Sequence, residues 1–261
     1  MIPALVKPFF LFVLIGLFFS ACEEKEPTEP TPEPAPKLYP VSITRTNSYS
    51  PDVTRSEYTY CCANQIIREQ VFKNEQLQSL TLFTYDVNGK LTDREYHSGT
   101  GQLVETDNIT YNPAGLPDRL SHAYLDANRQ PTPHHYRLHE FNAAGKISKW
   151  TDYKADGTVI NSRIYTYPAP EKVVSPAFNN NGLLVNTSEI TLDQNPMPFQ
   201  NTTLNLLPYA GNELKHVMKN PDGQIVLKYT NTITYNEAGY PAKIVQLYAD
   251  STVKTEVYQY K

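Results

Sequence analysis

The sequence lacks the features that mark most nucleic-acid-binding proteins and many enzymes. Its 23 Lys and Arg residues are outnumbered by 27 Asp and Glu residues, and the net charge of −4 offers no basic face for nucleic acid. No Gly-x-Ser-x-Gly motif, phosphate-binding glycine loop or metalloprotease helix motif occurs. No pair of carboxylates stands out as the pair that a glycosidase needs. The sequence therefore predicts no catalytic residue, no cofactor and no nucleic-acid partner.

Cysteine, tryptophan and methionine are scarce, whereas tyrosine is abundant. The 261 residues include 3 Cys, 1 Trp and 3 Met but 19 Tyr. No Cys-x-x-Cys motif is present, so thioredoxin chemistry has no support. Cys61 and Cys62 are adjacent in an expected strand, where their side chains point to opposite faces and a bridge between them is strained. Two thiols are the prediction, and a vicinal disulfide is the alternative.

Long apolar runs are absent except near the N-terminus, over residues 9–19. This run is too short for an ordinary transmembrane helix, which needs about 20 residues, and small residues follow it. These features predict an export signal over residues 1–21. The segment Phe19-Ser20-Ala21-Cys22 resembles a bacterial lipobox, which implies that Cys22 is acylated and becomes the mature N-terminus. A plain secretory signal peptide is the alternative.

Residues 22–37 form a segment of different composition. Residues 23–37 contain five Pro and no large apolar residue, so they favour extended polyproline II. Such a tether spans on the order of 45 Å. An acidic segment directly after a lipid-bearing Cys resembles the surface-export signal of Bacteroidetes lipoproteins, and an ordinary spacer is the alternative. The prediction is an outer-membrane lipoprotein of the bacterial cell envelope, exposed at the surface or facing the periplasm.

The remaining residues, 38–261, repeat a short motif that runs from an aromatic residue to a glycine. The aromatic is followed by Asp or Asn, two spacers, Gly and a return to apolar residues. The Asp or Asn side chain starts a turn by bonding its own backbone, and Gly supplies the positive φ that closes the turn. Clear copies begin at Tyr85, Tyr111, Phe141 and Tyr235, and a degenerate copy without the glycine begins at Tyr167.

Weaker turns alternate with these copies, so each repeat comprises two strands of about 8–10 residues. No stretch has a sustained helical period. The predicted fold class is all-β, with residues 38–261 forming a single domain. We expect a long antiparallel meander of tandem hairpins that forms a curved open sheet or a partial barrel. Residues 186–215 interrupt the rhythm and are expected to form a longer loop or a small cap over one face or end of the sheet.

The repeats resemble the YD repeats of Rhs-type proteins. They resemble more closely the tandem-hairpin lipoproteins of Bacteroidetes, whose domains are largely of unknown function. The segment Asp193-Gln194-Asn195-Pro196 supports the second resemblance, although two residues separate its Asn-Pro pair from the aromatic Phe199. The resemblance covers most of residues 58–261 and implies an architecture rather than an activity.

Histidines are concentrated in one region. His134, His135 and His139 form the densest group, and His122 is nearby in the sequence. On a strand, His135 and His139 share a face but lie about 13 Å apart, which is too far to bind one metal ion. His134 and His135 face opposite ways. No metal site is predicted.

Most tyrosines border turns, which favours a ladder of cross-strand aromatic pairs that sets the strand register. The functional alternative is a concave platform on which sugar rings stack. Trp150, Tyr153 and Tyr136 are the candidate ligand-binding residues, with Trp150 as the anchor.

The sequence thus predicts a membrane-anchored, non-catalytic protein that binds a glycan or another envelope or host macromolecule through an aromatic-rich sheet face. A structural or assembly partner of another envelope protein is one alternative. An enzyme acting on polysaccharide or peptide is the other.

Overall fold

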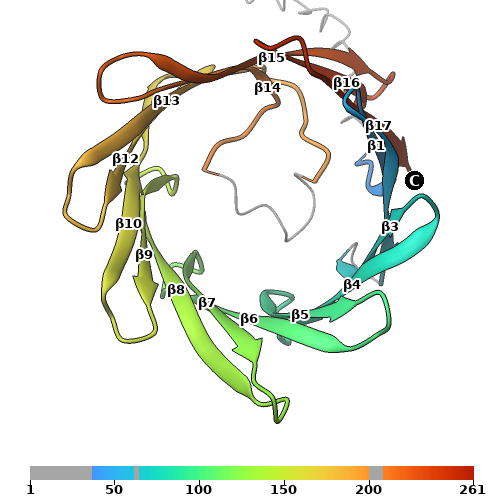
Figure 1. Ribbon diagram of the computed structural model, residues 1–261, viewed down its shortest axis with the longest axis vertical. Coiled ribbons are helices and arrows are strands. Elements are labelled where there is room, and N and C mark those ends of the chain that lie inside the picture. Colours follow the sequence, from blue (N-terminus) through green and yellow to red (C-terminus); the bar gives the residue numbers. More distant parts are fainter. Residues whose placement is uncertain (1–36, 62–64, 200–207) are drawn as a thin grey trace, which may run out of the picture. The chain divides into compact units, whose positions relative to one another are not determined.

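The computed structural model describes residues 37–61, 65–199 and 208–261, and all their regular elements are strands (Figure 1). Cys22, Cys62 and the predicted signal and tether over residues 1–36 lie outside the described residues. Within the described ranges no helix is long and apolar enough to cross a membrane. The strands are β1 (Pro40–Asn47), β2 (Ser50–Tyr60), β3 (Ile66–Lys73), β4 (Gln76–Tyr85), β5 (Leu91–Ser98), β6 (Leu103–Tyr111), β7 (Pro117–Leu125), β8 (Pro131–Phe141), β9 (Ile147–Lys154), β10 (Val159–Ile164), β11 (Thr166–Ala169), β12 (Lys172–Asn179), β13 (Leu184–Leu192), β14 (Glu213–Lys219), β15 (Ile225–Tyr235), β16 (Pro241–Tyr248) and β17 (Val253–Tyr260).

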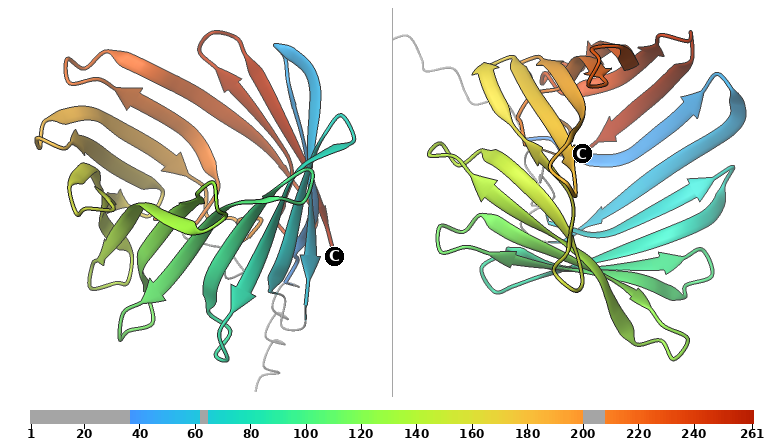
Figure 2. Two further views of the ribbon diagram at one scale, coloured as in Figure 1. Left: turned by 60° about the horizontal axis from the view of Figure 1, so that its bottom comes forward. Right: turned by 60° about the vertical axis from the view of Figure 1, so that its left-hand side comes forward.

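The strands form one antiparallel sheet that closes on itself as a barrel (Figures 1 and 2). Strands follow one another around the ring in chain order, and β1 pairs with both β2 and β17. Short β11 pairs with β12 beside β10, which leaves 16 strands in the ring. The predicted all-β antiparallel meander is confirmed. The prediction of an open sheet or partial barrel is wrong, because the pairing of Ile43 with Tyr258 joins the two ends of the meander and removes its free edges.

The turns between repeats have the chemistry that the sequence predicts. Asp86 Oδ1 accepts hydrogen bonds from the backbone N–H groups of Asn88 at 2.9 Å and Lys90 at 2.8 Å. Gly89 closes the turn with a φ of 78°, a conformation that strains residues with a Cβ. Equivalent side-chain bonds begin the turns at Asn112, Asn142 and Asn236.

Tyrosines tie the base of most hairpins together. The Tyr85 hydroxyl at the end of β4 donates to the Ile66 carbonyl at the start of β3, at 2.6 Å. Phe141 has no hydroxyl, and His139 Nδ1 lies 2.9 Å from the Pro117 carbonyl of the same hairpin. The tyrosine-to-carbonyl bond recurs at Tyr60, Tyr111, Tyr167 and Tyr260. Part of the tyrosine surplus is therefore a repeated structural device, because a buried hydroxyl needs a partner.

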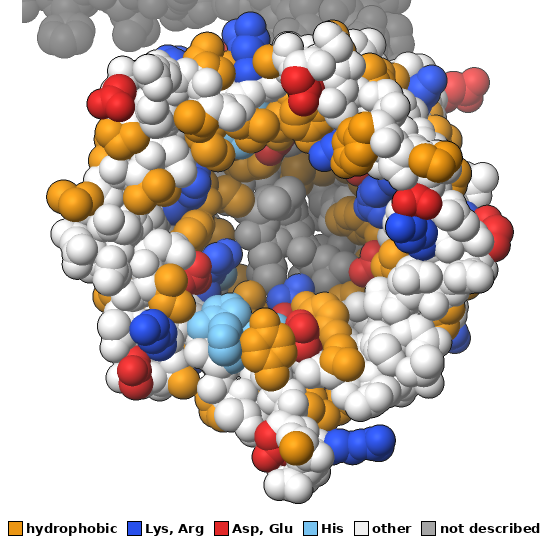
Figure 3. All heavy atoms as spheres, viewed as in Figure 1, with side chains coloured by type: hydrophobic (Ala, Val, Ile, Leu, Met, Phe, Trp, Pro, Cys, Tyr) orange, Lys and Arg blue, Asp and Glu red, His pale blue; other side chains and the backbone are white. Residues whose placement is uncertain are grey.

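The two faces of the barrel wall carry different side chains. Residues that pair directly across strands share a face, so the pairings Arg94 with Asp107 and Asp107 with His122 trace the inner wall. The inner wall bears many of the tyrosines and the two buried carboxylates Asp107 and Asp152. Figure 3 shows hydrophobic and charged side chains around the opening of the barrel. The outer wall bears threonine, charged and apolar side chains; the ion pair of Lys149 with Glu140 and the exposed Leu247 both lie on it.

In the connection from β13 to β14, the described residues 193–199 and 208–212 lie inside the barrel (Figure 1). Its ends are joined by Asp193, whose Oδ1 accepts the Asn212 backbone N–H at 2.8 Å. Its Phe199 ring packs edge-on against Tyr58 of β2, with 5.1 Å between the ring centroids. The interruption expected over residues 186–215 is narrower than its sequence suggests, because β13 continues to Leu192 and β14 begins at Glu213.

Candidate functional site

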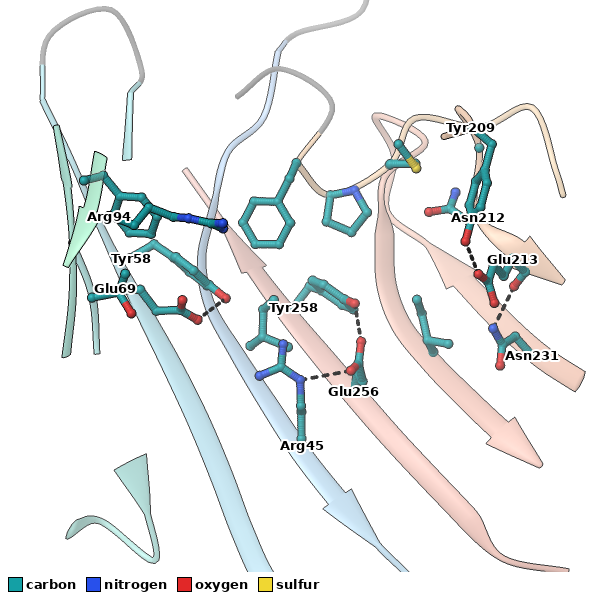
Figure 4. Close-up of a pocket in the computed structure, with 18 of the residues that line it drawn as sticks. Arg45, Tyr58, Glu69, Arg94, Tyr209, Asn212, Glu213, Asn231, Glu256 and Tyr258 are labelled. Atoms are coloured by element: carbon teal, nitrogen blue, oxygen red, sulfur yellow. Dashed lines mark hydrogen bonds and ion pairs between the residues drawn. The ribbon is translucent and has the colours of Figure 1, made fainter. Parts of the chain in front are cut away.

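A cavity of about 580 Å³ lies between the inner wall and two described parts of the connection, residues 197–199 and 209–212 (Figure 4). Its walls come from β1 to β5 on one side and from β14 to β17 on the other. These two groups of strands are neighbours only because β1 pairs with β17. The cavity therefore exists as a consequence of barrel closure, and no single repeat contains it.

Arg45 and Glu256 form the central ion pair of the cavity wall. Arg45 Nε lies 2.9 Å from Glu256 Oε1, and Arg45 Nη1 donates to Ser56 Oγ at 2.9 Å. Burial disfavours the charge on Arg45, but Glu256 outweighs this effect, so the pKa of Arg45 is raised. The Tyr258 hydroxyl donates to Glu256 as well, and burial together with that carboxylate raises the pKa of Tyr258. This tyrosine is therefore a neutral hydrogen-bond donor.

A second network surrounds Asp107, which is only 5% exposed. Its Oδ2 lies 2.6 Å from Arg94 Nη2 and accepts the Tyr96 hydroxyl at 2.8 Å, and His122 Nδ1 lies 2.7 Å from its Oδ1. A buried carboxylate needs both a counter-charge and hydrogen bonds, and Asp107 has both. The ion pair with Asp107 orients the guanidinium of Arg94, and Arg94 also lines the cavity.

Two further glutamates line the cavity, and both accept hydrogen bonds from tyrosine hydroxyls. Tyr58 donates to Glu69 Oε1 at 2.9 Å. Glu213 accepts the hydroxyls of Tyr209 and Tyr229. Burial and the adjacent Glu213 raise the pKa of both these tyrosines, so they remain protonated donors.

Two buried polar atoms in the cavity wall lack a hydrogen-bond partner among the described residues. One is the Nε–H donor of Arg94 and the other is the Oδ1 acceptor of Asn231. Asn231 uses its amide nitrogen to bond the Glu213 backbone carbonyl at 2.7 Å, which points its oxygen elsewhere. An unpaired buried polar group costs about 1–3 kcal/mol, so a ligand that pairs with these atoms gains affinity.

The structure does not bring the three predicted ligand-binding residues together. Trp150 lies on the inner wall, where its Nε1 donates to the Tyr165 hydroxyl at 2.8 Å and the Arg137 guanidinium lies 4.1 Å from its ring centroid. Tyr136 and Tyr153 stack on the outer wall, with ring centroids 5.0 Å apart. Trp150 is not among the residues that line the cavity.

The histidines cluster across strands, which their spacing in the sequence does not reveal. His122 of β7 pairs with His135 of β8 at a centroid distance of 4.8 Å, and His134 Nδ1 lies 2.7 Å from His135 Nδ1. Within the described part of the chain, no group of three or more metal-binding side chains has the arrangement to hold an ion.

Cys61 Sγ lies 3.6 Å from Gln65 Oε1, and the predicted thiol state of Cys61 and Cys62 stays a prediction.

Sequence reasoning missed the charged residues of the cavity, although a signal for them exists. Arg94 lies two positions before Tyr96, and Glu256 lies two positions before Tyr258. Residues two apart on a strand share a face, so a charge at this spacing from an inward tyrosine also points inward. The sequence alone does not show that the strand face with these tyrosines lines the interior of a closed barrel.

Comparisons with known proteins support the architecture. No protein-family model matches the chain, and no curated protein matches it. A porin-like protein from Bacteroides uniformis is similar in structure, with a TM-score of 0.60 and 10% identity over 85% of this chain and 98% of that one. A porin-like protein from Bacteroides vulgatus has a TM-score of 0.51 and 11% identity over 85% and 99%. The likeness is one of fold.

Proposed function

We propose that the protein is a lipid-anchored, non-catalytic binding protein of the bacterial cell envelope whose ligand site is the barrel interior. The observation that carries this proposal is the cavity of about 580 Å³, which combines tyrosine side chains with an unpaired donor and an unpaired acceptor. Small-molecule sites typically measure about 300–1,000 Å³ and hold a few polar groups that fix orientation. The aromatic-rich binding face is in this view the inner wall.

The charged side chains of the outer wall favour a barrel whose outer surface contacts water rather than lipid. Lys149 Nζ lies 2.9 Å from Glu140 Oε1, and Lys219 Nζ lies 2.8 Å from Glu189 Oε1. These four side chains belong to strands and point outward. Membrane-spanning barrels carry an apolar outward band, where a Lys or Arg at the midplane costs about 2–4 kcal/mol. We therefore assign membrane attachment to the predicted lipid on Cys22.

The binding role is tested by filling the interior. Full-length protein is isolated from its membranes in mild detergent and examined by native mass spectrometry before and after incubation with a small-molecule extract of the envelope. We expect a bound small molecule on the wild type and its loss in Ile244→Trp, because Ile244 lines the cavity. Leu247→Trp is the matched control on the same strand, since Leu247 is 48% exposed on the outer wall. The proposal fails if no small molecule binds, or if Ile244→Trp binds as the wild type does.

A role as an assembly partner is the second candidate, and one surface favours it. The hairpin ends of β12–β13 and β14–β15 are adjacent and expose Leu183, Ile225 and Val226, at 63%, 56% and 57%. Exposed apolar patches mark protein interaction sites. Cross-linking of whole cells, followed by purification, is expected in this case to recover one stoichiometric protein partner from wild type and much less from a Leu183→Glu, Ile225→Glu variant.

A further inference from the structure

The charges around the cavity do not balance. Arg45 is paired with Glu256, and Arg94 is paired with Asp107. Glu69 and Glu213 also line the cavity, and in the described part of the chain neither forms an ion pair. The wall therefore carries an excess of negative charge, because both cations are already neutralised. An anionic ligand meets repulsion there, and its transfer out of water is not compensated.

The two unpaired polar atoms require opposite partners. Arg94 Nε donates and needs an acceptor, whereas Asn231 Oδ1 accepts and needs a donor. Figure 4 shows these residues on opposite sides of the cavity, Arg94 beside Tyr58 and Asn231 beside Glu213. A hydroxyl group donates and accepts at once, so a ligand with several hydroxyls can satisfy both atoms without carrying charge.

Apolar surface completes the lining. The rings of Tyr58 and Phe199 meet edge to face at 5.1 Å, and Met197, which is buried and belongs to the same connection as Phe199, also lines the cavity. Such surfaces pack against the C–H faces of a ring while polar groups at its edge form hydrogen bonds. The volume of about 580 Å³ has room for one or two rings of a sugar.

We infer that the cavity binds a hydroxyl-rich ligand without negative charge, a saccharide of one or two rings, held between Arg94 Nε and Asn231 Oδ1. This inference rests on the proposed function and names its ligand class. Arg94 supplies the donor to a ring or hydroxyl oxygen, and Asn231 accepts from a hydroxyl on the opposite edge. Glu69 and Glu213, which have no cation as partner in the described part of the chain, weaken the binding of acidic sugars.

The test uses the full-length protein in mild detergent and a fixed set of probes. Glucose, galactose, N-acetylglucosamine, maltose and lactose represent neutral sugars, glucuronic acid represents anions, and glucosamine represents amines. Binding is measured by saturation-transfer NMR and isothermal titration calorimetry. We expect at least one neutral sugar to bind. Glucuronic acid should bind about tenfold more weakly than that sugar, because the cavity wall carries an excess of negative charge.

Two variants probe the contacts, and one serves as control. Arg94→Lys keeps the counter-charge of Asp107 but removes Nε. Asn231→Leu has a similar volume and removes Oδ1, together with the amide nitrogen that donates to the Glu213 backbone carbonyl. Each is expected to weaken neutral-sugar binding by about tenfold, the effect of one lost hydrogen bond to a buried group. Leu247→Trp, on the outer wall, should leave affinity unchanged. Near-ultraviolet circular dichroism checks that each variant is folded.

Three outcomes overturn the inference. The first is tighter binding of glucuronic acid than of every neutral sugar, which leaves the proposed function standing but replaces its ligand class. The second is unchanged neutral-sugar affinity in folded Arg94→Lys and Asn231→Leu. The third is loss of binding in Leu247→Trp alone, which moves the site to the outer wall. Failure of every envelope molecule to bind, with Ile244→Trp indistinguishable from wild type, instead overturns the proposed function.

Discussion

The Tyr111 hydroxyl donates to the backbone carbonyl of Leu91 at 2.8 Å, from the end of one strand of a hairpin to the start of the other. The bond spans twenty residues of sequence and joins the two ends of the hairpin next to the turns that link repeats. Burial raises the pKa of Tyr111, so this side chain remains a neutral donor at physiological pH. Because the same bond closes five hairpins, it stabilises the repeat itself rather than one site.

Removing one of these hydroxyls is expected to destabilise the barrel. Tyr111→Phe leaves the Leu91 carbonyl without this donor, and we expect the free energy of unfolding to fall by about 1 kcal/mol. Tyr124→Phe is the matched control, since Tyr124 is 43% exposed. Urea unfolding followed by tyrosine fluorescence measures the difference. Equal stability of the two variants would show that the hydroxyl contributes nothing.

Two equivalent turns allow a test of backbone strain in both directions. Gly145 has a φ of 73°, and no atom lies within 4 Å of the point that a Cβ would occupy, so Gly145→Ala adds strain without a clash. We expect a loss of about 1 kcal/mol. Arg129 occupies the same turn position with a φ of 61°, so Arg129→Gly should relieve strain and change stability less, or in the opposite direction. The melting temperatures of the two variants, each compared with the wild type, measure the effect. A larger decrease in Arg129→Gly than in Gly145→Ala contradicts the argument.

Acidification is expected to destabilise the protein before its carboxylates titrate. Burial lowers the pKa of His135 and of His139, so the unfolded chain binds protons at a higher pH than the folded chain does. Their contribution is therefore complete above about pH 6.5, the unfolded value, and is lost as the pH falls through the folded values. His139→Gln keeps a donor for the Pro117 carbonyl and should reduce the acid sensitivity.

The measurement is the melting temperature of wild type and His139→Gln between about pH 7.5 and about pH 5, a window above the carboxylate pKa values. A wild-type melting temperature that stays constant or rises on acidification would contradict the assignment. So would equal acid sensitivity in the variant, because the titrating group would then lie elsewhere.

Membrane attachment should depend on one side chain. Cys22→Ala removes the predicted lipid site, and we expect the protein to move from the membrane to the soluble fraction of the envelope. Fractionation after a high-salt wash measures the shift. A variant that stays in the membrane would place the barrel itself in the bilayer, against the outward ion pair of Lys219 with Glu189.

The local structure was predictable because its causes are local. The turn at Asp86 needs only its own side chain, two backbone N–H groups and Gly89, all within five residues. Strand and turn alternation follows from the same motif, and with it the antiparallel meander. The break near Asp193 was also visible, because Asn195 and Pro196 depart from the repeat.

Closure and the cavity depended on contacts that no local pattern contains. Thr44 pairs with Val257 across almost the whole chain, and His122 meets His135 only because two strands have one particular register. The prediction assigned Trp150, Tyr136 and Tyr153 to one concave platform, whereas the sheet places Trp150 on the face opposite to that of the two tyrosines.

The sequence by itself determined the hairpins, because side-chain-to-backbone bonds and positive φ angles act over a few residues. It also determined the alternation of inward and outward side chains along each strand. Only the tertiary structure decided which of the two faces became the inside, and that Arg94 and Asn231 face one cavity. The physical reason is that curvature and closure are collective properties of the whole sheet, set when β1 meets β17 rather than within any repeat.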